Sequence, residues 1–510
     1  MTKHLSRRDF LKSTGAATAA TGISLSPLAA FASRAAAQGD LPLVELRYLI
    51  RGQAQPDVET VQNALNAILE ERINAHIILD FIEPGAFNDQ MALINAAAEE
   101  YDLVYTAPWT NNYYTNVNQE YLLPLDDLLM EYAPGTWASM QPATWEAARV
   151  DGQIYGVINQ QIFVKPFGPS IRTDILDQLD LWDQFQAVSH YSELTPILAQ
   201  LHELVQQDDS LTHVFAGGSI FMPEIWGFDP QGSQDLGLAV RSTDADAQVQ
   251  IWAQQDEFRQ AAELTREWYL AGYRPSDVLT PDEQDRGWSA GQYPLRGLAG
   301  VVKPGGDAEV EARWGWPVFS VPIAEPLLTT AGTTATLTGI SSTSRNPERA
   351  MMFLELLNTD ETIYNMLCKG VEGVHWEWAD EERRLIQPAG GAESFTDVGW
   401  NPNTDWMFGN VFNSYYSSEA QVGAWPETAE LNRNARPSPV LGFTFDVTPV
   451  ETEIASLAGV GSEFTEPLVN GLVDTEAGIQ ALVDAQLAAG IERVQEEMQR
   501  QIDAWKESMA

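Results

Sequence analysis

Apolar positions in the first third of the chain follow two alternating patterns. Short apolar runs closed by Gly52 or by Pro84-Gly85 are typical of buried strands. Longer segments that repeat apolar residues every three to four positions are typical of amphipathic helices. The order β-α-β-α-β predicts an α/β fold with a parallel sheet and right-handed crossovers. The expected elements are strands at 44–50, 77–82 and 103–105 and helices at 56–75 and 88–99.

The segments that follow these strands carry the first chemical signal. Parallel strands end at one edge of their sheet, and ligands bind in the crevice beside that edge. Residues 109–114, after the third strand, combine tryptophan and tyrosine rings with two asparagines. Such a mixture suits sugars, because flat rings cover their C–H faces while amides bond their hydroxyls. The alternative is that these rings begin the next helix and pack inward.

The rest of the chain predicts a hairpin, several helices and a second strand-to-helix unit. Asp151-Gly152 between apolar runs favours a type I′ turn. Asn346 and Pro347 are typical of a helix start, as cap and first-turn residue. The expected elements are a hairpin at 150–157, helical segments at about 174–208 and 246–272, a strand at 339–344 with a helix after it, and a helix at about 475–508 broken at Gly490.

The composition indicates a large folded protein with a strongly acidic surface. The 510 residues, 44% of them hydrophobic, suffice for two lobes with cores of their own. The net charge of -43 repels phosphate backbones and anionic lipids, so nucleic acid and membrane-surface binding are poor interpretations. The single Cys368 allows no intrachain disulfide, and the six histidines show no metal-binding spacing. No metal or cofactor is therefore expected.

The amino terminus reads as an export signal. Residues 6–12, Ser-Arg-Arg-Asp-Phe-Leu-Lys, match the twin-arginine motif, and an uncharged Ala-rich segment follows at 13–33. Ala35-Ala36-Ala37 offers a cleavage site, so residues 1–37 are predicted to be a signal peptide. Twin-arginine substrates cross the membrane folded, and the mature protein is expected on the periplasmic or extracellular side. No cysteine lies near the cleavage site, so a lipid anchor is not expected.

Several motifs in order along the chain resemble the extracellular solute-binding proteins of carbohydrate ABC importers, solute-binding family 1. The first are the strand at 101–105 running on to Leu-Pro-Leu-Asp-Asp at 123–127, and Asp-Gly-Gln-Ile-Tyr-Gly at 151–156. The next is the strand-to-helix return from Gly339 to Leu354. Three later stretches are similar to the LipO/LplA branch, near the alginate-binding proteins: 370–376, 442–446 and 489–505.

This resemblance implies a two-lobed periplasmic-binding-protein fold of type II, with ligand held in the cleft. The chain would cross the hinge several times, so each lobe is discontinuous. The expected lobes are 41–160 with 317–375, and 161–316 with 376–510. The implied partners are a small-molecule ligand and the membrane permease of an ABC importer, with the receptor as a monomer. Alginate-binding relatives carry a calcium loop near the position of 206–210, but its Asp/Asn spacing is missing here, so no calcium is expected.

The candidate ligand contacts are aromatic, amide and acidic residues in loops where the lobes should meet. Gln160 and Gln161 follow the hairpin, where the chain should approach the hinge. Tryptophan is more often a core residue than a ligand platform, and a structural role is the simpler interpretation of His375. Arg433 and Arg436 could pair a ligand carboxylate, although salt bridges within this acidic protein explain them as well. The candidates are Trp109, Asn111, Tyr155, Gln160, Gln161, Trp226, Trp288, Glu372, His375, Trp376 and Trp400.

The sequence therefore favours capture of a sugar or short oligosaccharide over catalysis. Lobes that close around a ligand need no covalent chemistry. Two alternatives remain. One is a receptor for a peptide, polyamine or organic acid. The other is a glycoside hydrolase, which would need two carboxylates facing each other across the cleft. No nucleophile elbow, phosphate-binding loop or HExxH motif supports an enzyme.

Overall fold

The computed structural model describes residues 42–164, 166–232, 236–277, 281–402 and 405–509. The predicted signal peptide, residues 1–37, lies outside these ranges. Residues from Leu43 onward form one compact unit of mixed helix and sheet. Among the described residues, no helix has the length and apolar character needed to cross a bilayer.

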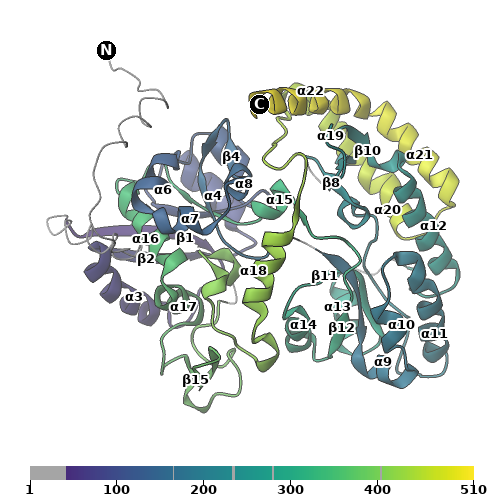
Figure 1. Cartoon of the computed structure of the whole chain (residues 1–510), viewed down its shortest axis with the longest axis horizontal. Coiled ribbons are helices and arrows are strands. Elements are labelled where there is room, and N and C mark those ends of the chain that lie inside the picture. Colours follow the sequence, from purple (N-terminus) through teal and green to yellow (C-terminus); the bar gives the residue numbers. More distant parts are fainter. Residues whose placement is uncertain (1–41, 165, 233–235, 278–280, 403–404, 510) are drawn as a thin grey trace, which may run out of the picture. The chain divides into compact units, whose positions relative to one another are not determined.

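Four strands from the first third of the chain and one later strand build a five-stranded sheet. The order is β2 (Ala75–Ile82), β1 (Val44–Arg51), β3 (Leu103–Thr106), β14 (Leu337–Ile340) and β6 (Gly156–Ile158). Strand β1 runs parallel to β2 and β3, and β14 is antiparallel to β3 and β6. Helix α3 (Val58–Ile73) packs on β2, and α4 (Phe87–Ala96) connects β2 to β3 (Figure 1). The predicted β-α-β-α-β order is confirmed.

Strand β14 lies between β3 and β6, and its position determines which chain segments lie together at one edge of this sheet. Leu337 at the start of β14 pairs with Thr106 at the end of β3 and with Ile158 at the end of β6. The carboxyl ends of β1, β2, β3 and β6 and the amino end of β14 therefore share one edge. Segments nearly 300 residues apart in sequence are brought together there.

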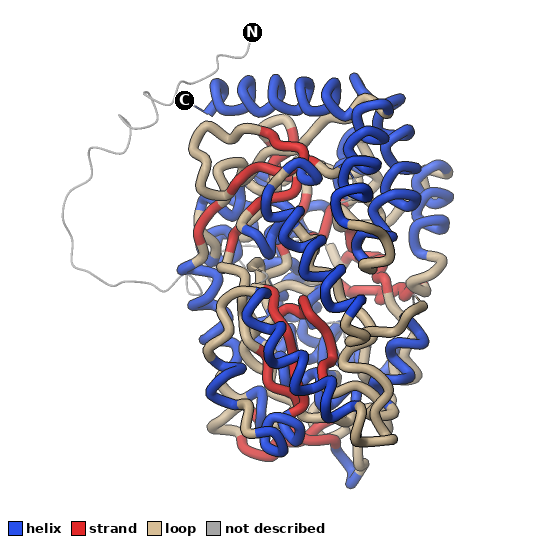
Figure 2. Tube along the Cα trace, turned by 90° about the vertical axis from the view of Figure 1, so that its right-hand side faces the viewer, coloured by secondary structure: helices blue, strands red, loops and turns tan. Residues whose placement is uncertain are grey.

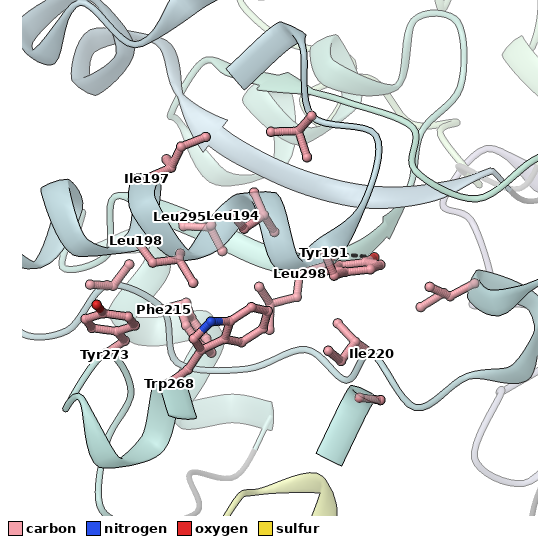
Figure 3. Packing of buried hydrophobic residues seen from close by; sticks show 14 of the residues in the cluster. Tyr191, Leu194, Ile197, Leu198, Phe215, Ile220, Trp268, Tyr273, Leu295 and Leu298 are labelled. Carbon is pink, nitrogen blue, oxygen red and sulfur yellow. Dashed lines mark hydrogen bonds between the residues drawn. The ribbon is translucent and has the colours of Figure 1, made fainter. Parts of the chain in front are cut away.

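A second group of elements has its own core. Strand β7 (Phe167–Arg172) lies between β11 (Leu295–Val301) and β12 (Val318–Ser320), antiparallel to both. Helices α11 (Thr195–Val205) and α12 (Asp256–Leu270) supply much of the apolar packing. Figure 3 shows Tyr191, Leu198 and Trp268 in this core, where the Tyr191 hydroxyl donates to the Leu298 carbonyl oxygen at 2.8 Å.

The carboxy-terminal helices close a further core. Helix α22 (Ile491–Met509) packs its apolar face on a small sheet of β8 (Phe228–Pro230), β9 (Leu238–Arg241) and β10 (Val249–Ile251) (Figure 2). The predicted break at Gly490 is confirmed, since its φ of 91° ends α21 (Thr475–Ala488). The helix expected at 246–272 begins only at Asp256, because Val249 and Ile251 alternate and pair with β9 instead.

Three segments link the part of the chain that contains the five-stranded sheet to the part that contains the other two cores. They are 161–166, 321–336 and 417–437. In the second and third, β13 (Leu327–Leu328) pairs with β17 (Arg436–Pro437). The positions at which the chain passes from one part to the other differ from the lobe boundaries expected at 317 and 376. Strand β12, after 317, pairs with β7, and Trp400, after 376, contacts Phe81 at the end of β2.

The two predicted turn and cap signals have different outcomes. The Asp151-Gly152 turn is confirmed, with φ of 49° and 80° between the short strands β4 (Arg149–Val150) and β5 (Gln153–Ile154). Asn346 does stand at the N-cap of α16 (Pro347–Thr359), but its side chain makes no capping hydrogen bond.

Candidate ligand-binding site

Two tryptophans lie exposed side by side at the shared edge of the five-stranded sheet. Trp109 is 51% exposed and Trp406 37% exposed, and their ring centroids are 6.2 Å apart with 40° between the planes. Both rings contact the buried ring of Tyr105 in β3. Exposed indoles are costly to leave in water, so this pair, here called the indole platform, is a candidate ligand surface.

Hydrogen bonds from the linking segments hold the indole platform in place. The Trp109 indole N–H donates to the Ala335 carbonyl oxygen at 2.8 Å. The Thr336 hydroxyl donates to the Trp406 carbonyl oxygen at 3.2 Å, and the Gln161 amide donates to the same hydroxyl at 2.7 Å. Both rings are therefore fixed where the chain passes between the two halves.

A half-buried polar cluster fixes the short turn that carries Trp406. The Lys369 ammonium pairs with the Asp405 carboxylate at 2.6 Å, and the Ser414 hydroxyl donates to that carboxylate at 2.7 Å. The Tyr364 hydroxyl donates to the Asp405 carbonyl oxygen at 2.8 Å. With these contacts the turn is pre-organised, which reduces the entropy lost when a ligand binds.

One arginine flanks the indole platform. Arg51 ends β1, and its guanidinium carbon lies 5.1 Å from the centre of the Trp109 ring, within the range of a cation–π contact. The Tyr105 hydroxyl is buried without a hydrogen bond, and burial raises the pKa of this phenol while the Arg51 charge opposes the shift. The platform thus offers aromatic faces and one cation.

A cavity of about 730 Å³ lies along the same linking segments. Its walls come from Pro166, from residues 302–307 and 320–326, and from α18 (Ala424–Asn434). The Asn432 side chain of α18 donates to the Gln161 carbonyl oxygen at 2.6 Å, so this helix packs on the segment that supports the indole platform. The volume is in the range of small-molecule sites.

The charged residues of the cavity wall are mostly acidic. They are Asp307, Glu325, Glu427 and Glu430, with one lysine, Lys303. Burial raises the pKa of the Asp307 carboxyl, and its hydrogen bonds from Ser320 oppose that shift. Carboxylates accept hydrogen bonds from sugar hydroxyls or from a cation, and they disfavour a polyanion.

Five of the predicted contacts are buried, with polar atoms that bond the protein itself. Trp400 is 1% exposed and donates to the Leu367 carbonyl oxygen at 3.0 Å, and Trp376 donates to the Gly370 carbonyl oxygen at 3.0 Å. His375 accepts from the Val371 N–H and contacts Asp57. Gln160 and Asn111 bond neighbouring protein groups in the same way. The polar atoms of these side chains are engaged by bonds within the protein.

The other predicted contacts are divided between core and surface. Trp288 is buried in a small cluster with Tyr293, and Trp226 packs against Tyr191 and donates to the Ile220 carbonyl oxygen at 2.6 Å. Glu372 is exposed, and Tyr155 is half-buried with its hydroxyl on Gln153. Of the predicted set, Trp109 and Gln161 lie together at the sheet edge.

Sequence reasoning missed Trp406, Arg51 and helix α18. Trp406 follows Asn-Pro-Asn-Thr-Asp at 401–405, which is the same mixture of aromatic and amide residues that singled out Trp109. That signal was available, whereas the position of Trp406 beside Trp109 depends on strand β14 and is not visible in the sequence.

The architecture and this site define a class of protein. The chain has the fold of the two-lobed solute-binding proteins, which confirms the fold expected from the motifs. The residues at 4–24 match the twin-arginine translocation signal, and residues 439–507 match a domain of unknown function, DUF3502.

The known proteins to which this chain is similar are also solute-binding proteins, several of them named for carbohydrate ligands. A carbohydrate ABC transporter substrate-binding protein of Streptococcus pneumoniae is 26% identical, over 92% of both chains. The N-glycan transport solute-binding protein NgtS of the same species has a TM-score of 0.81 at 22% identity, over 92% of this chain and 100% of that one. The TM-scores to its complexes with Man1GlcNAc and Man5GlcNAc are 0.71 and 0.67. The alginate-binding protein AlgQ2 has a TM-score of 0.54 at 16% identity, over 91% and 98% of the chains.

Proposed function

We propose that this protein is the exported receptor of an ABC importer and captures an oligosaccharide on the indole platform. The observation that carries the proposal is the pair of exposed tryptophans held at the meeting edge of a solute-binding fold. Indole faces stack on the apolar faces of sugars, and the neighbouring amide and carboxylate groups suit their hydroxyls. The relatives named as carbohydrate and N-glycan binding proteins support the same conclusion.

We also propose how the chain divides into lobes. The first lobe comprises 43–160 and 337–416, and the second comprises 167–320 and 438–509. The hydrogen bond from Asn401 N–H to Gln55 and the bridge between Leu385 and Tyr416 support the assignment of 376–416 to the first lobe. The three linking segments act as the hinge, and closure over the ligand yields the form that docks on the permease.

The thermal stability of the mature protein against a glycan library tests the function. A ligand that binds only the folded form raises the melting temperature, and Man1GlcNAc and Man5GlcNAc belong in the library. Trp109→Ala and Trp406→Ala should each weaken binding by about 1 kcal/mol or more, while Trp109→Phe loses less because a smaller ring remains. Leu93→Ala, at a 71% exposed leucine of α4, is the surface control.

Two further measurements separate glycan capture from glycan hydrolysis and from binding of another solute. A receptor returns its glycan intact after prolonged incubation, as judged by mass spectrometry, whereas a hydrolase returns fragments. A receptor for another solute gains stability from a peptide or polyamine pool and from no glycan. Unchanged affinity in both tryptophan variants would show that the indole platform is not the site.

A further inference from the structure

Arg51 stands out among the arginines that could meet a ligand. Arg433 and Arg436, near the cavity, are already paired with Glu430 at 2.8 Å and Glu325 at 3.1 Å. The Arg51 side chain, in contrast, has no hydrogen bond or ion pair to any residue in the described ranges, and its Nε atom is buried without a partner. The guanidinium lies against the face of Trp109.

An arginine side chain that neither donates a hydrogen bond nor forms an ion pair among the described residues is unexpected in so acidic a chain. The chain carries 72 acidic residues against 29 lysines and arginines, so acidic partners are abundant. A buried N–H donor without an acceptor is destabilising, and the fold keeps one at the end of strand β1. The indole ring holds the guanidinium in place without occupying its N–H groups, which remain available for an acceptor from a ligand.

The surroundings define the acceptor that would fit. A guanidinium presents a planar fork that matches a carboxylate through two parallel hydrogen bonds. The guanidinium lies over the Trp109 ring, so a sugar ring placed on the indole platform would have Arg51 as a neighbour. We propose, on the basis of the function proposed above, that Arg51 binds the carboxylate of an acidic sugar whose ring lies on the indole platform.

The charge of the rest of the molecule limits the number of carboxylates. Asp307, Glu325, Glu427 and Glu430 line the cavity, and the net charge is -43. A polyuronate would meet this field along its whole length, whereas one acidic sugar at Arg51 meets a local cation. The preferred ligand is therefore a largely neutral glycan with a single uronic or sialic acid.

Matched pairs of glycans test this specificity. One pair is a monosialylated complex N-glycan and the same glycan after sialidase treatment, and the other is glucuronosyl-β1,4-glucose and cellobiose. Isothermal titration of the mature protein should give about ten- to hundredfold tighter binding of the acidic member of at least one pair. That ratio should fall as salt is added, because the contact is between charges.

Substitution of Arg51 tests whether this residue causes the preference for the acidic glycan. Arg51→Gln should bring the acidic-to-neutral affinity ratio close to one, and Arg51→Lys should keep part of it because the charge remains without the fork. Arg500→Gln, which removes one positive charge from the exposed face of α22, should leave the ratio unchanged. Melting temperatures of all three variants show whether the fold is intact.

The outcomes distinguish this inference from the function on which it rests. Equal or tighter binding of the neutral member, with the ratio unmoved by Arg51→Gln, overturns the role of Arg51 and leaves glycan capture standing. Failure of all four probes and of the whole glycan library overturns both proposals.

Discussion

Asp229 should make the folded protein less stable as the pH rises from about 4 to about 7. This residue lies in β8, is 2% exposed and leaves one carboxylate oxygen without a partner. Burial raises the pKa of its carboxyl to about 7; a hydrogen bond from Ser438 opposes the rise and the nearby Glu224 adds to it. The nearest arginines of this sheet and of β17 are engaged elsewhere, Arg241 with Glu257 and Arg436 with Glu325.

The direction of this change in stability follows from the number of protons that the folded and the unfolded state bind. Between pH 4 and pH 7 the folded Asp229 keeps its proton, while the unfolded residue, with a pKa near 3.8, has lost it. The free energy of unfolding therefore falls with rising pH across this window and is level above it. The full shift corresponds to roughly 4 kcal/mol, at about 1.4 kcal/mol for each pKa unit.

Asp229→Asn removes this dependence, because the amide stays neutral at every pH. The difference in unfolding free energy between variant and parent should be small at pH 4.5 and should reach roughly 2–4 kcal/mol in favour of the variant at pH 8. Urea denaturation at several pH values, with the two proteins side by side, measures that difference. Asp209→Asn, at an exposed position, is the control for the change in net charge.

Two results would show that burial does not keep Asp229 protonated in the folded protein. One is a difference that stays constant from pH 4.5 to pH 8, since a constant difference reports packing and not ionisation. The other is a parent protein that is more stable than Asp229→Asn at pH 8, which would mean that the ionised carboxylate is well accommodated in the fold.

Two further predictions concern the fold that positions the site. Gly168→Ala should lower the unfolding free energy by about 2 kcal/mol or more, because a Cβ there would overlap the Val321 carbonyl oxygen. Gly297→Ala, with open space around its Cβ position, should cost far less. Glu355→Gln should cost about 1.5–3 kcal/mol by urea denaturation, because the buried carboxylate accepts two backbone N–H bonds, at 2.9 and 2.8 Å, and Glu348→Gln on the same helix should cost little.

Local pattern predicted the elements of this fold well where one face of each element is buried. The strands at 44–50 and 77–82 and the helix at 56–75 were recognised because their apolar spacing reflects contact with a single core. The segment at 246–255 was misjudged because two apolar residues at Val249 and Ile251 fit a helix and a short strand equally. In the folded protein these residues pair with β9, so the segment forms a strand.

The candidate site was harder to predict, because loops rich in tryptophan look alike whether they are covered or exposed. Trp109 and Trp400 both follow glycine-, proline- or asparagine-bearing turns, yet Trp400 packs on Phe81 and donates to a backbone carbonyl, while half of Trp109 faces solvent. Burial of a loop depends on which other segment covers it, and that segment is remote in sequence. Arg51 gave no signal, since the absence of its partner is visible only in three dimensions.

The way the indole platform is supported connects ligand binding to lobe movement. Trp406 is held from one side by Asp405 and its partners in the proposed first lobe, and from the other by Thr336 and Gln161, which lie in two of the linking segments. A hinge motion changes the backbone of those segments, so it must either carry the Thr336 contact along or break it. A ligand seated on both indoles favours the arrangement in which that contact is kept. Binding energy at the platform is then available to select one relation between the lobes, which is what a receptor that signals occupancy to a permease requires.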